Sequence, residues 1–359
     1  MGKLVLLDTT RTGRQSQDLE TKLRSMVVGQ DAAVHEVVAA YQRHTTGLSP
    51  AGRPVGNFLF LGPTGSGKTR IVEATAQALL NDPKAVVKID CAEYQHSHEI
   101  AKLIGSPPGY LGHRETHPLL SQDALNRHHT EKLKLSLVLF DEIEKASDAL
   151  WNLLLGILDK GILTLGDNRK VDFSSSMIFL TSNLGAAEMS ALSEARLGFH
   201  SPAARDAGYR GGPDVKMSRI GAAAARRKFS PEFINRLDKI VVFKPLGDAE
   251  LRSILEIELE TVYQRLQAAV PNSAFQVTVA ESARELLLKE GTDSRYGARH
   301  LKRAIERFLV QPLSNLLASG QIQRGDLIRV THRCDSDSLV FFREAARRDA
   351  WKLAGSIAA

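Results

Sequence analysis

The sequence predicts an α/β fold, in which a parallel sheet is covered by helices and a smaller α+β domain follows. Two observations carry this prediction. Five short apolar runs alternate with segments of helical spacing in the first part of the chain. The first run, residues 58–61, leads directly into a glycine-rich stretch, residues 62–69. Strands that alternate with helices require right-handed crossovers, which give a parallel sheet covered on both faces.

The glycine-rich stretch matches G-x-x-x-x-G-K-[ST], the pattern of a phosphate-binding loop. Helical spacing follows from residue 70 to 79, so the loop aims its backbone N–H groups and a helix N-terminus at one anion. A glycine turn that matches by chance is the alternative, and the strand before it and the helix after it argue against that. The expected ATP-binding residues of the loop are Pro63, Thr64, Gly65, Ser66, Gly67, Lys68 and Thr69.

Within this loop, Lys68 is expected to reach the β- and γ-phosphates, and the Thr69 hydroxyl to bind Mg²⁺. The apolar run at residues 137–142 ends in Asp141 and Glu142, where phosphate-loop hydrolases place the aspartate on the metal side. We expect Asp141 to hold the Mg²⁺ shell and Glu142 to act as general base toward water. The two carboxylates could instead cap the helix that follows, but the upstream phosphate loop favours catalysis. The next apolar run, residues 177–183, ends in Asn183, which could orient the water or contact the γ-phosphate.

The remaining apolar runs and the segments after Pro245 complete the predicted architecture. Pro245 marks a boundary, because an amphipathic helix, residues 248–269, follows it. Short strands and helices come next, among them a helix at about residues 297–309 and a strand at residues 327–330. A possible strand at residues 339–342 lies in the last segment. The predicted organisation is an N-terminal extension (1–26), a large ATPase domain (27–244), a small C-terminal lid domain (245–331) and a C-terminal tail (332–359).

The composition, 43% hydrophobic and 25% charged, is that of a soluble globular protein. No run approaches the roughly 18 apolar residues of a membrane span, so no membrane partner is expected. The two cysteines, Cys91 and Cys334, do not make a disulfide framework or a zinc site, and a cytoplasmic location is expected. The net charge of +6 permits an acidic partner. Nucleic acid is an unlikely partner, because no basic run with interleaved aromatic residues is present.

One further loop, residues 105–112, is rich in turn-forming residues and carries Tyr110 and Leu111 between two glycines. The tyrosine could pack back on the body of the domain, or it could be an exposed grip for a partner. Composition leaves both interpretations open.

Several short sequence motifs match those of one protein family, and they occur in the same order along the chain. The chain resembles the AAA+ module of Clp-type unfoldases, most closely the second ring module of the two-ring members. The resemblance covers roughly residues 27–331. The matching motifs are Val28–Asp31, Gly62–Thr69, Gly105–Gly112, Leu139–Ala146, Thr181–Asn183, Phe229–Asp238 and Tyr296–Arg299.

The resemblance implies an ATP hydrolase that uses ATP and Mg²⁺ and works as a homohexameric ring. Asn183 is similar to the sensor of the γ-phosphate. Arg236 is similar to the arginine finger that one subunit donates to its neighbour's nucleotide, and Arg299 to the second sensor arginine. Val27 and Val28 fall where the family packs the adenine. Without the resemblance, either arginine could be an ordinary solvated residue.

The resemblance also implies that the ring threads unfolded or misfolded proteins through its central pore. Tyr110, flanked by Leu111, matches the aromatic residue that grips the chain, and tyrosine suits a sequence-tolerant grip because it offers a large apolar area with few rotatable bonds. Residues 164–171 fall where the family has its second pore loop.

The chain departs from the large members of the family, since only about 26 residues precede the module, and a stand-alone single-ring protein is expected. Leu197, Gly198 and Phe199 lie in the interval where peptidase-coupled members carry a tripeptide that docks on a Clp peptidase. The alternative is a loop anchor in which Phe199 packs on the core. Two other functions remain as rivals: a motor that acts on nucleic acid, and an assembly protein that uses ATP only to set its oligomeric state.

Overall fold

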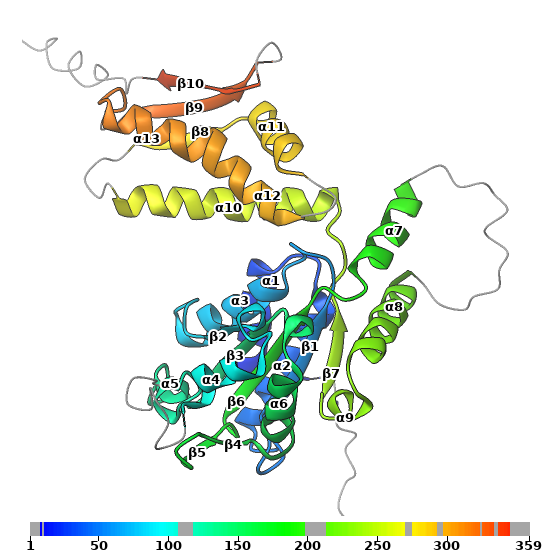
Figure 1. Cartoon of the computed structure of the whole chain (residues 1–359). Helices are drawn as coiled ribbons and strands as arrows, with labels where there is room; N and C mark the ends of the chain where they lie inside the picture. Colours follow the sequence, from blue (N-terminus) through cyan, green and yellow to red (C-terminus); the bar gives the residue numbers. More distant parts are fainter. Residues whose placement is uncertain are drawn as a thin grey trace, which may run out of the picture. The chain divides into compact units, whose positions relative to one another are not determined.

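A computed structural model of the 359-residue chain describes residues 8, 11–106, 118–197, 213–269, 275–292, 297–323, 325–333 and 337–344 (Figure 1). The chain divides into two compact units, Met1–Pro245 and Leu246–Ala359. None of the helices described is both long enough and apolar enough to cross a membrane.

The first unit is built on a five-stranded sheet in the order β2-β3-β6-β1-β7, and every neighbouring pair is parallel. The predicted parallel sheet is therefore confirmed, and each of the five apolar runs forms one strand. The central strands β1 and β6 are buried along their whole length, as expected for strands covered on both faces. The strands of the sheet are β1 (Gly56–Leu61), β2 (Val87–Asp90), β3 (Ser136–Asp141), β6 (Ser176–Ser182) and β7 (Lys239–Val242).

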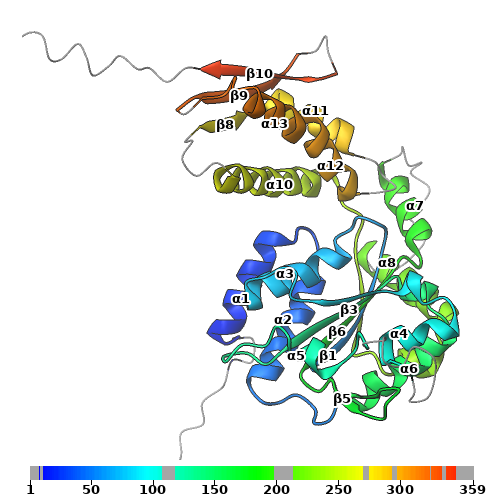
Figure 2. The same ribbon diagram turned by 60° about the vertical axis from the view of Figure 1, so that its left-hand side comes forward.

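Successive side chains of the central strands point to opposite faces of the sheet, and each face has its own core. Phe58 and Phe60 of β1 lie against Phe179 of β6, with ring centroids 5.5 and 5.6 Å apart, on one face. Leu59 and Leu61 belong to the core on the other face. The first face is covered by α1 (Arg14–Met26), α2 (Asp31–Thr45) and α3 (Lys68–Leu80) (Figures 1 and 2).

The opposite face is covered by five helices that contribute buried residues to the second core. These are α4 (Ala101–Ile104), α5 (Gln122–Asn126), α6 (Asp148–Lys160), α8 (Pro213–Lys228) and α9 (Pro231–Ile234). α7 (Ala186–Leu197) contacts α8, and α6 leads into a two-stranded antiparallel hairpin of β4 (Ile162–Thr164) and β5 (Lys170–Asp172). Because all five strands of the main sheet run the same way, their carboxyl ends meet at one edge, which is where open α/β sheets bind ligands.

The second unit contains a three-stranded sheet in the order β10-β9-β8, in which β8 and β9 are parallel and β9 and β10 antiparallel. β10 (Leu339–Glu344) lies in the segment that the sequence assigns to a separate tail, yet it pairs with β9 along its whole length. The other elements are β8 (Gln276–Val279), β9 (Leu327–His332), α10 (Asp248–Ala269), α11 (Glu281–Gly291), α12 (Ala298–Ile305) and α13 (Gln311–Ala318).

A π-helical turn, Glu306–Val310, joins α12 to α13. The predicted helix at 297–309 therefore continues to residue 318, because Pro312 falls in the first turn of α13 rather than after the end of α12. The backbone N–H of Gln311 donates to Glu306 O in a π-helical bond, and this local change in hydrogen bonding accommodates Pro312, which has no N–H to donate.

Gly291 provides a test of the packing in the second unit. It is buried at the end of α11, and a Cβ atom there would lie 2.7 Å from Leu301 Cδ1 and 2.8 Å from Leu301 Cα in α12. The backbone atom cannot move aside unless α12 moves too. We expect Gly291→Ala to lower the free energy of unfolding by about 1–3 kcal/mol in urea titrations.

The matched control is Gly156→Ala in α6, where the nearest atom to the new Cβ would be 3.7 Å away. Alanine is the better helix former, so this change should leave the free energy of unfolding unchanged or raise it by up to about 1 kcal/mol. Equal destabilisation by the two substitutions would contradict the packing argument.

Candidate active site

The phosphate loop runs from the end of β1 into the first turn of α3, as its pattern predicts. The Lys68 ammonium donates to Gly62 O at 2.7 Å, Pro63 O at 2.9 Å and Asn183 Oδ1 at 2.9 Å. Gly67, which precedes α3, has φ +100°, a conformation that favours glycine. The lysine is therefore held inside the loop and against the end of β6, where a bound anion would meet its charge.

The end of β6 also positions the two carboxylates that end β3. The Thr181 hydroxyl donates to Asp141 Oδ1, and Thr181 Oγ1 accepts from the backbone N–H of Glu142 at 3.1 Å. Lys88 Nζ of β2 lies 3.3 Å from Asp141 Oδ2. One threonine therefore fixes both members of the acidic pair relative to the sheet.

Glu142 has an unusual backbone and a charged neighbour. Its φ of 57° lies in the left-handed region, which costs a residue other than glycine about 1–2 kcal/mol. Strain of this kind clusters at functional sites, where the surroundings hold it in place. Glu142 Oε2 lies 2.5 Å from Lys145 Nζ, and this hydrogen bond raises the pKa of Lys145. In this state the carboxylate of the expected base is ion-paired.

Asn183 links the loop to the acidic segment. Its Oδ1 accepts from Lys68 and lies 3.5 Å from the Thr64 hydroxyl, and its backbone N–H donates to Glu144 Oε1 at 3.0 Å. The other oxygen of Glu144 is buried and has no hydrogen-bond partner among the described residues. The structure thus brings together Lys68, Asn183 and the acidic segment that follows β3.

Several carboxylates lie near the buried thiol of Cys91 at this edge of the sheet. Burial, and then the carboxylates of Asp90, Asp141, Glu144 and Glu142, raise the pKa of Cys91 far above its ordinary value. The thiol therefore stays neutral at physiological pH. Mg²⁺ typically takes one or two protein carboxylates while phosphates and waters complete its shell, and this edge offers such carboxylates.

The Thr69 hydroxyl and the Asp141 carboxylate are hard oxygen donors of the kind that Mg²⁺ prefers. Thr69 is the second residue of α3, and Asp141 is the last residue of β3. Within the described ranges, no group of three or more His, Cys, Asp or Glu residues is arranged to hold a metal by itself. The donor set fits a metal that arrives with a nucleotide.

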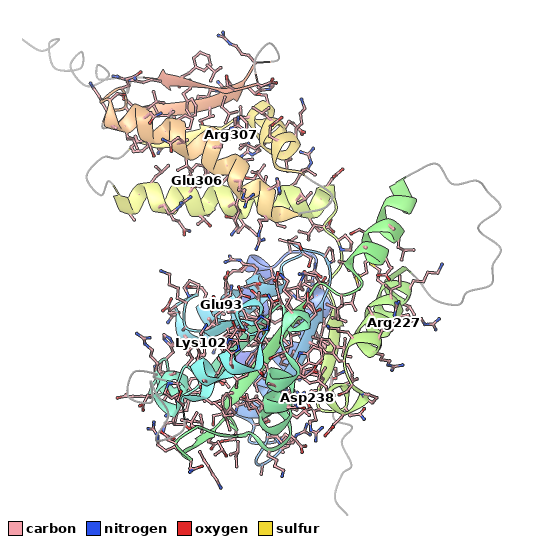
Figure 3. All side chains as sticks on the ribbon, viewed as in Figure 1. Glu93, Lys102, Arg227, Asp238, Glu306 and Arg307 are labelled. Carbon is pink, nitrogen blue, oxygen red and sulfur yellow. The ribbon has the colours of Figure 1, made fainter. Side chains whose placement is uncertain are left out.

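Arg236 lies away from these residues, at the amino ends of the strands. Its backbone carbonyl accepts from Asn57 Nδ2 at 3.3 Å, and Asn57 is the second residue of β1. Asp238, labelled in Figure 3, binds the backbone N–H of Asn57 at the same end. Gly62 follows Asn57 by five positions, and a strand rises about 3.3 Å per residue, so the phosphate loop begins about 16 Å away.

The Arg236 guanidinium forms ion pairs with two carboxylates at the amino edge of the sheet. Its Nη1 lies 2.8 Å from Glu232 Oε1, and its Nε lies 3.7 Å from Asp159 Oδ2 at the end of α6. The side chain is 23% exposed, so it is neither solvated throughout nor buried. Arg236 therefore belongs to a different surface from the phosphate loop of its own chain.

Three other expected site residues are described. Val27 is buried and Val28 half-buried after the end of α1. Arg299 is exposed near the start of α12 in the second unit. Their expected roles toward adenine and phosphate remain predictions.

Tyr110 and Leu111, the expected grip, lie outside the described residues, as do Gly198 and Phe199 of the expected docking tripeptide. Leu197 is the last residue of α7.

The turn between β4 and β5 contacts the backbone of residues 104 and 105. The backbone N–H of Gly166, in the turn between β4 and β5, donates to Ile104 O at 2.8 Å. A Cβ atom on residue 166 would lie 2.5 Å from Gly105 O, so the two backbones touch there only because residue 166 is glycine. The turn that corresponds to the expected second pore loop therefore shares its base with the segment that leads toward Tyr110.

Sequence reasoning did not single out Thr181 and Glu144, which the structure shows to position the acidic pair and Asn183. Both residues lie within recognisable motifs, Thr181 in the one that ends β6 and Glu144 in the one that follows β3.

Comparison with known proteins agrees with this arrangement. Residues 53–240 match the family described as AAA domain (Cdc48 subfamily), and residues 246–330 match the C-terminal, D2-small domain of ClpB protein. The chain therefore belongs to the AAA family, and its first unit is a nucleotide-binding AAA ATPase domain. The predicted fold and the resemblance to Clp-type proteins are confirmed.

The similar proteins include the chaperone protein ClpB of Bdellovibrio bacteriovorus, 39% identical over 323 residues, which are 90% of this chain and 34% of that protein. ClpB of Rhizobium meliloti is 39% identical over 327 residues, 91% of this chain and 34% of that protein. The chain thus spans about a third of the length of these relatives. Among solved structures, a closed-state cryo-EM reconstruction of Hsp104 with ATPyS and FITC casein is similar, with a TM-score of 0.73, 27% identity, and 92% and 52% of the two chains covered.

Proposed function

We propose that this protein is an ATP-driven remodelling chaperone that works as a homohexameric ring and threads unfolded or misfolded polypeptides through its pore. The observation that carries the proposal is the separation of Arg236 from the phosphate loop of its own chain. An arginine at the opposite edge of the sheet serves hydrolysis only if a neighbouring copy presents it to the next site. Hydrolysis then depends on ring assembly.

The residues at the carboxyl edge divide the chemistry of ATP hydrolysis among them. The loop N–H groups and Lys68 bind the phosphates, and Asn183 contacts the γ-phosphate. Thr69 and Asp141 would hold Mg²⁺, which neutralises charge on the phosphate oxygens. Glu142 accepts a proton from water as the water oxygen bonds to the γ-phosphorus, while the bond to the β–γ bridging oxygen breaks. The products are ADP and phosphate.

The remaining roles follow the family resemblance. Val27 and Val28 contact the adenine, and Arg299 of the small domain acts as a second sensor of the nucleotide. The similarity to ClpB chaperones and to an Hsp104 structure that contains casein supports a polypeptide as the substrate. It gives no support to delivery of substrates to a Clp peptidase through residues 197–199, and it disfavours a nucleic-acid motor.

The test is an ATPase assay with and without casein, run beside a sizing measurement with and without a slowly hydrolysed ATP analogue. We expect casein to stimulate turnover and the analogue to produce rings. Turnover that responds to single-stranded DNA in a salt-sensitive manner, and not to casein, would favour the nucleic-acid motor instead.

Tyr110→Ala is expected to hydrolyse ATP at close to the normal basal rate but to lose most unfolding of a tagged fluorescent substrate. The reason is that the substitution removes the apolar area of the grip and leaves the nucleotide site untouched. Tyr110→Phe is the matched control, because it keeps the aromatic ring, and it should retain unfolding. Full unfolding by the alanine variant would contradict the pore assignment.

A further inference from the structure

Gln30 makes an unusual set of contacts for a residue that precedes a helix. It stands immediately before α2, but its side chain does not cap that helix, and the residue is only 5% exposed. Its Nε2 donates to Ser66 O at 3.0 Å and to Lys244 O at 3.0 Å. Its Oε1 accepts from the backbone N–H of Lys244 at 3.1 Å. One buried amide thus uses both of its donors and its acceptor to join the phosphate loop to residue 244.

The segment that Gln30 holds is the exit from the sheet. β7 ends at Val242, and the backbone N–H of Phe243 still donates to Leu61 O at 2.7 Å. At the next residue, Lys244, the side-chain amide of Gln30 replaces β1 as the hydrogen-bond partner, since it binds both the N–H and the C=O of Lys244. Lys244 and Pro245 are the last residues of the first unit, so this segment leads directly into the second unit.

The start of the phosphate loop touches the same segment without an intermediary. Gly62 has φ +154°, and a Cβ atom there would lie 2.7 Å from Phe243 O and 2.9 Å from Phe243 Cβ. The loop therefore contacts the exit segment twice, through Gly62 directly and through Ser66 by way of Gln30. Interiors packed this closely transmit displacements rather than absorbing them.

We propose that Gln30 is a positioning residue that couples the phosphate loop to the exit segment, residues 243–245, so that a nucleotide bound in the loop orders that segment. The inference rests on the proposed nucleotide binding by this loop. The physical coupling is a contiguous chain of hydrogen bonds from Ser66 through the Gln30 amide to the backbone of Lys244. Through these bonds, nucleotide binding in the phosphate loop changes how firmly the backbone that leads into the small domain is held.

Hydrogen exchange of the full chain, with and without a slowly hydrolysed ATP analogue, tests the coupling. Peptides that end on either side of Lys244 report on its amide, and peptides from the first turns of α3 report on nucleotide binding itself. In the wild type we expect the analogue to slow exchange at both places, at Lys244 by about fivefold, the factor for one net hydrogen bond of about 1 kcal/mol. In Gln30→Met the effect should persist in α3 and vanish at Lys244.

Two further variants sharpen the result. Gln30→Glu keeps an acceptor for the Lys244 N–H but loses the donors to Ser66 O and Lys244 O, so it should also lose the response at Lys244 even if Gln30→Met folds poorly. Gln17→Met is the control for the substitution itself, because Gln17 is exposed on α1 and its side-chain amide donates to the backbone carbonyl of Thr12. It should leave both responses unchanged.

The outcomes separate the two levels of the proposal. No response in α3 of the wild type would refute nucleotide binding by this loop. A response in α3 with none at Lys244, or a response at Lys244 that survives in Gln30→Met and Gln30→Glu, would overturn the coupling alone.

Discussion

Arg236→Ala is expected to bind ATP normally and to lower turnover by about 10³–10⁵-fold, the range for loss of an arginine finger. The guanidinium is a permanently charged fork that stabilises charge on the transferring phosphoryl group. In this chain it lies at the amino edge of the sheet, beside Asp159 and Glu232, and not beside Lys68. Phosphate release in the steady state and titration with a fluorescent nucleotide would measure the two quantities.

Mixing subunits shows whether the arginine acts between chains. Lys68→Ala and Arg236→Ala rings should each be nearly inactive, whereas mixed rings should regain part of the activity, because a Lys68→Ala subunit still presents Arg236 to an intact neighbouring loop. Arg236→Lys is the matched control for charge, and it should rescue little because an ammonium lacks the bidentate fork. Normal turnover by Arg236→Ala would leave the residue as an ion-pair partner of α6 and α9 only.

Glu142→Gln is expected to bind ATP, to assemble, and to lower turnover by about 10²–10⁴-fold, the usual contribution of a general base. Glutamine has the same shape, so the strained backbone at φ 57° and its bond to Thr181 can persist. Only the capacity to accept a proton and the ion pair with Lys145 are lost. Single-turnover phosphate release would separate slowed chemistry from weakened binding.

Glu93→Gln is the control for removal of one negative charge near this edge. Glu93, labelled in Figure 3, is exposed in the short helix that follows β2. It makes none of the contacts that position the phosphate loop, so turnover should change little. If both glutamine variants hydrolysed ATP at the wild-type rate, Glu142 could not be the base.

The parallel sheet and its helices could be predicted because each strand and helix has a recognisable pattern over a few consecutive residues. The runs that became β1 and β6 are continuous apolar segments, which is what a strand buried on both faces requires. The helix through residue 318 was not predictable in full, because Pro312 usually ends a helix and only the preceding π-helical turn accommodates it. The sequence indicates a possible strand at residues 339–342, but it does not show that this strand pairs with β9, so β10 was assigned to a separate tail.

The candidate site shows the same division. Lys68, Asp141, Glu142 and Asn183 stand in short motifs whose spacing indicates their chemistry, so sequence reasoning could select them as candidates. Gln30 meets residue 244 across 214 positions, and no local pattern records such a contact. Contacts of this kind are set by how the strands are ordered in the sheet.

The bare backbone contact between residues 105 and 166 restricts how this protein can vary. Gly166 leaves no room for a side chain against the carbonyl of Gly105, so the backbones of these two residues fix each other's position. A bulkier residue at position 166 would therefore push residue 105 away, so any change at one of these two positions must be accommodated at the other.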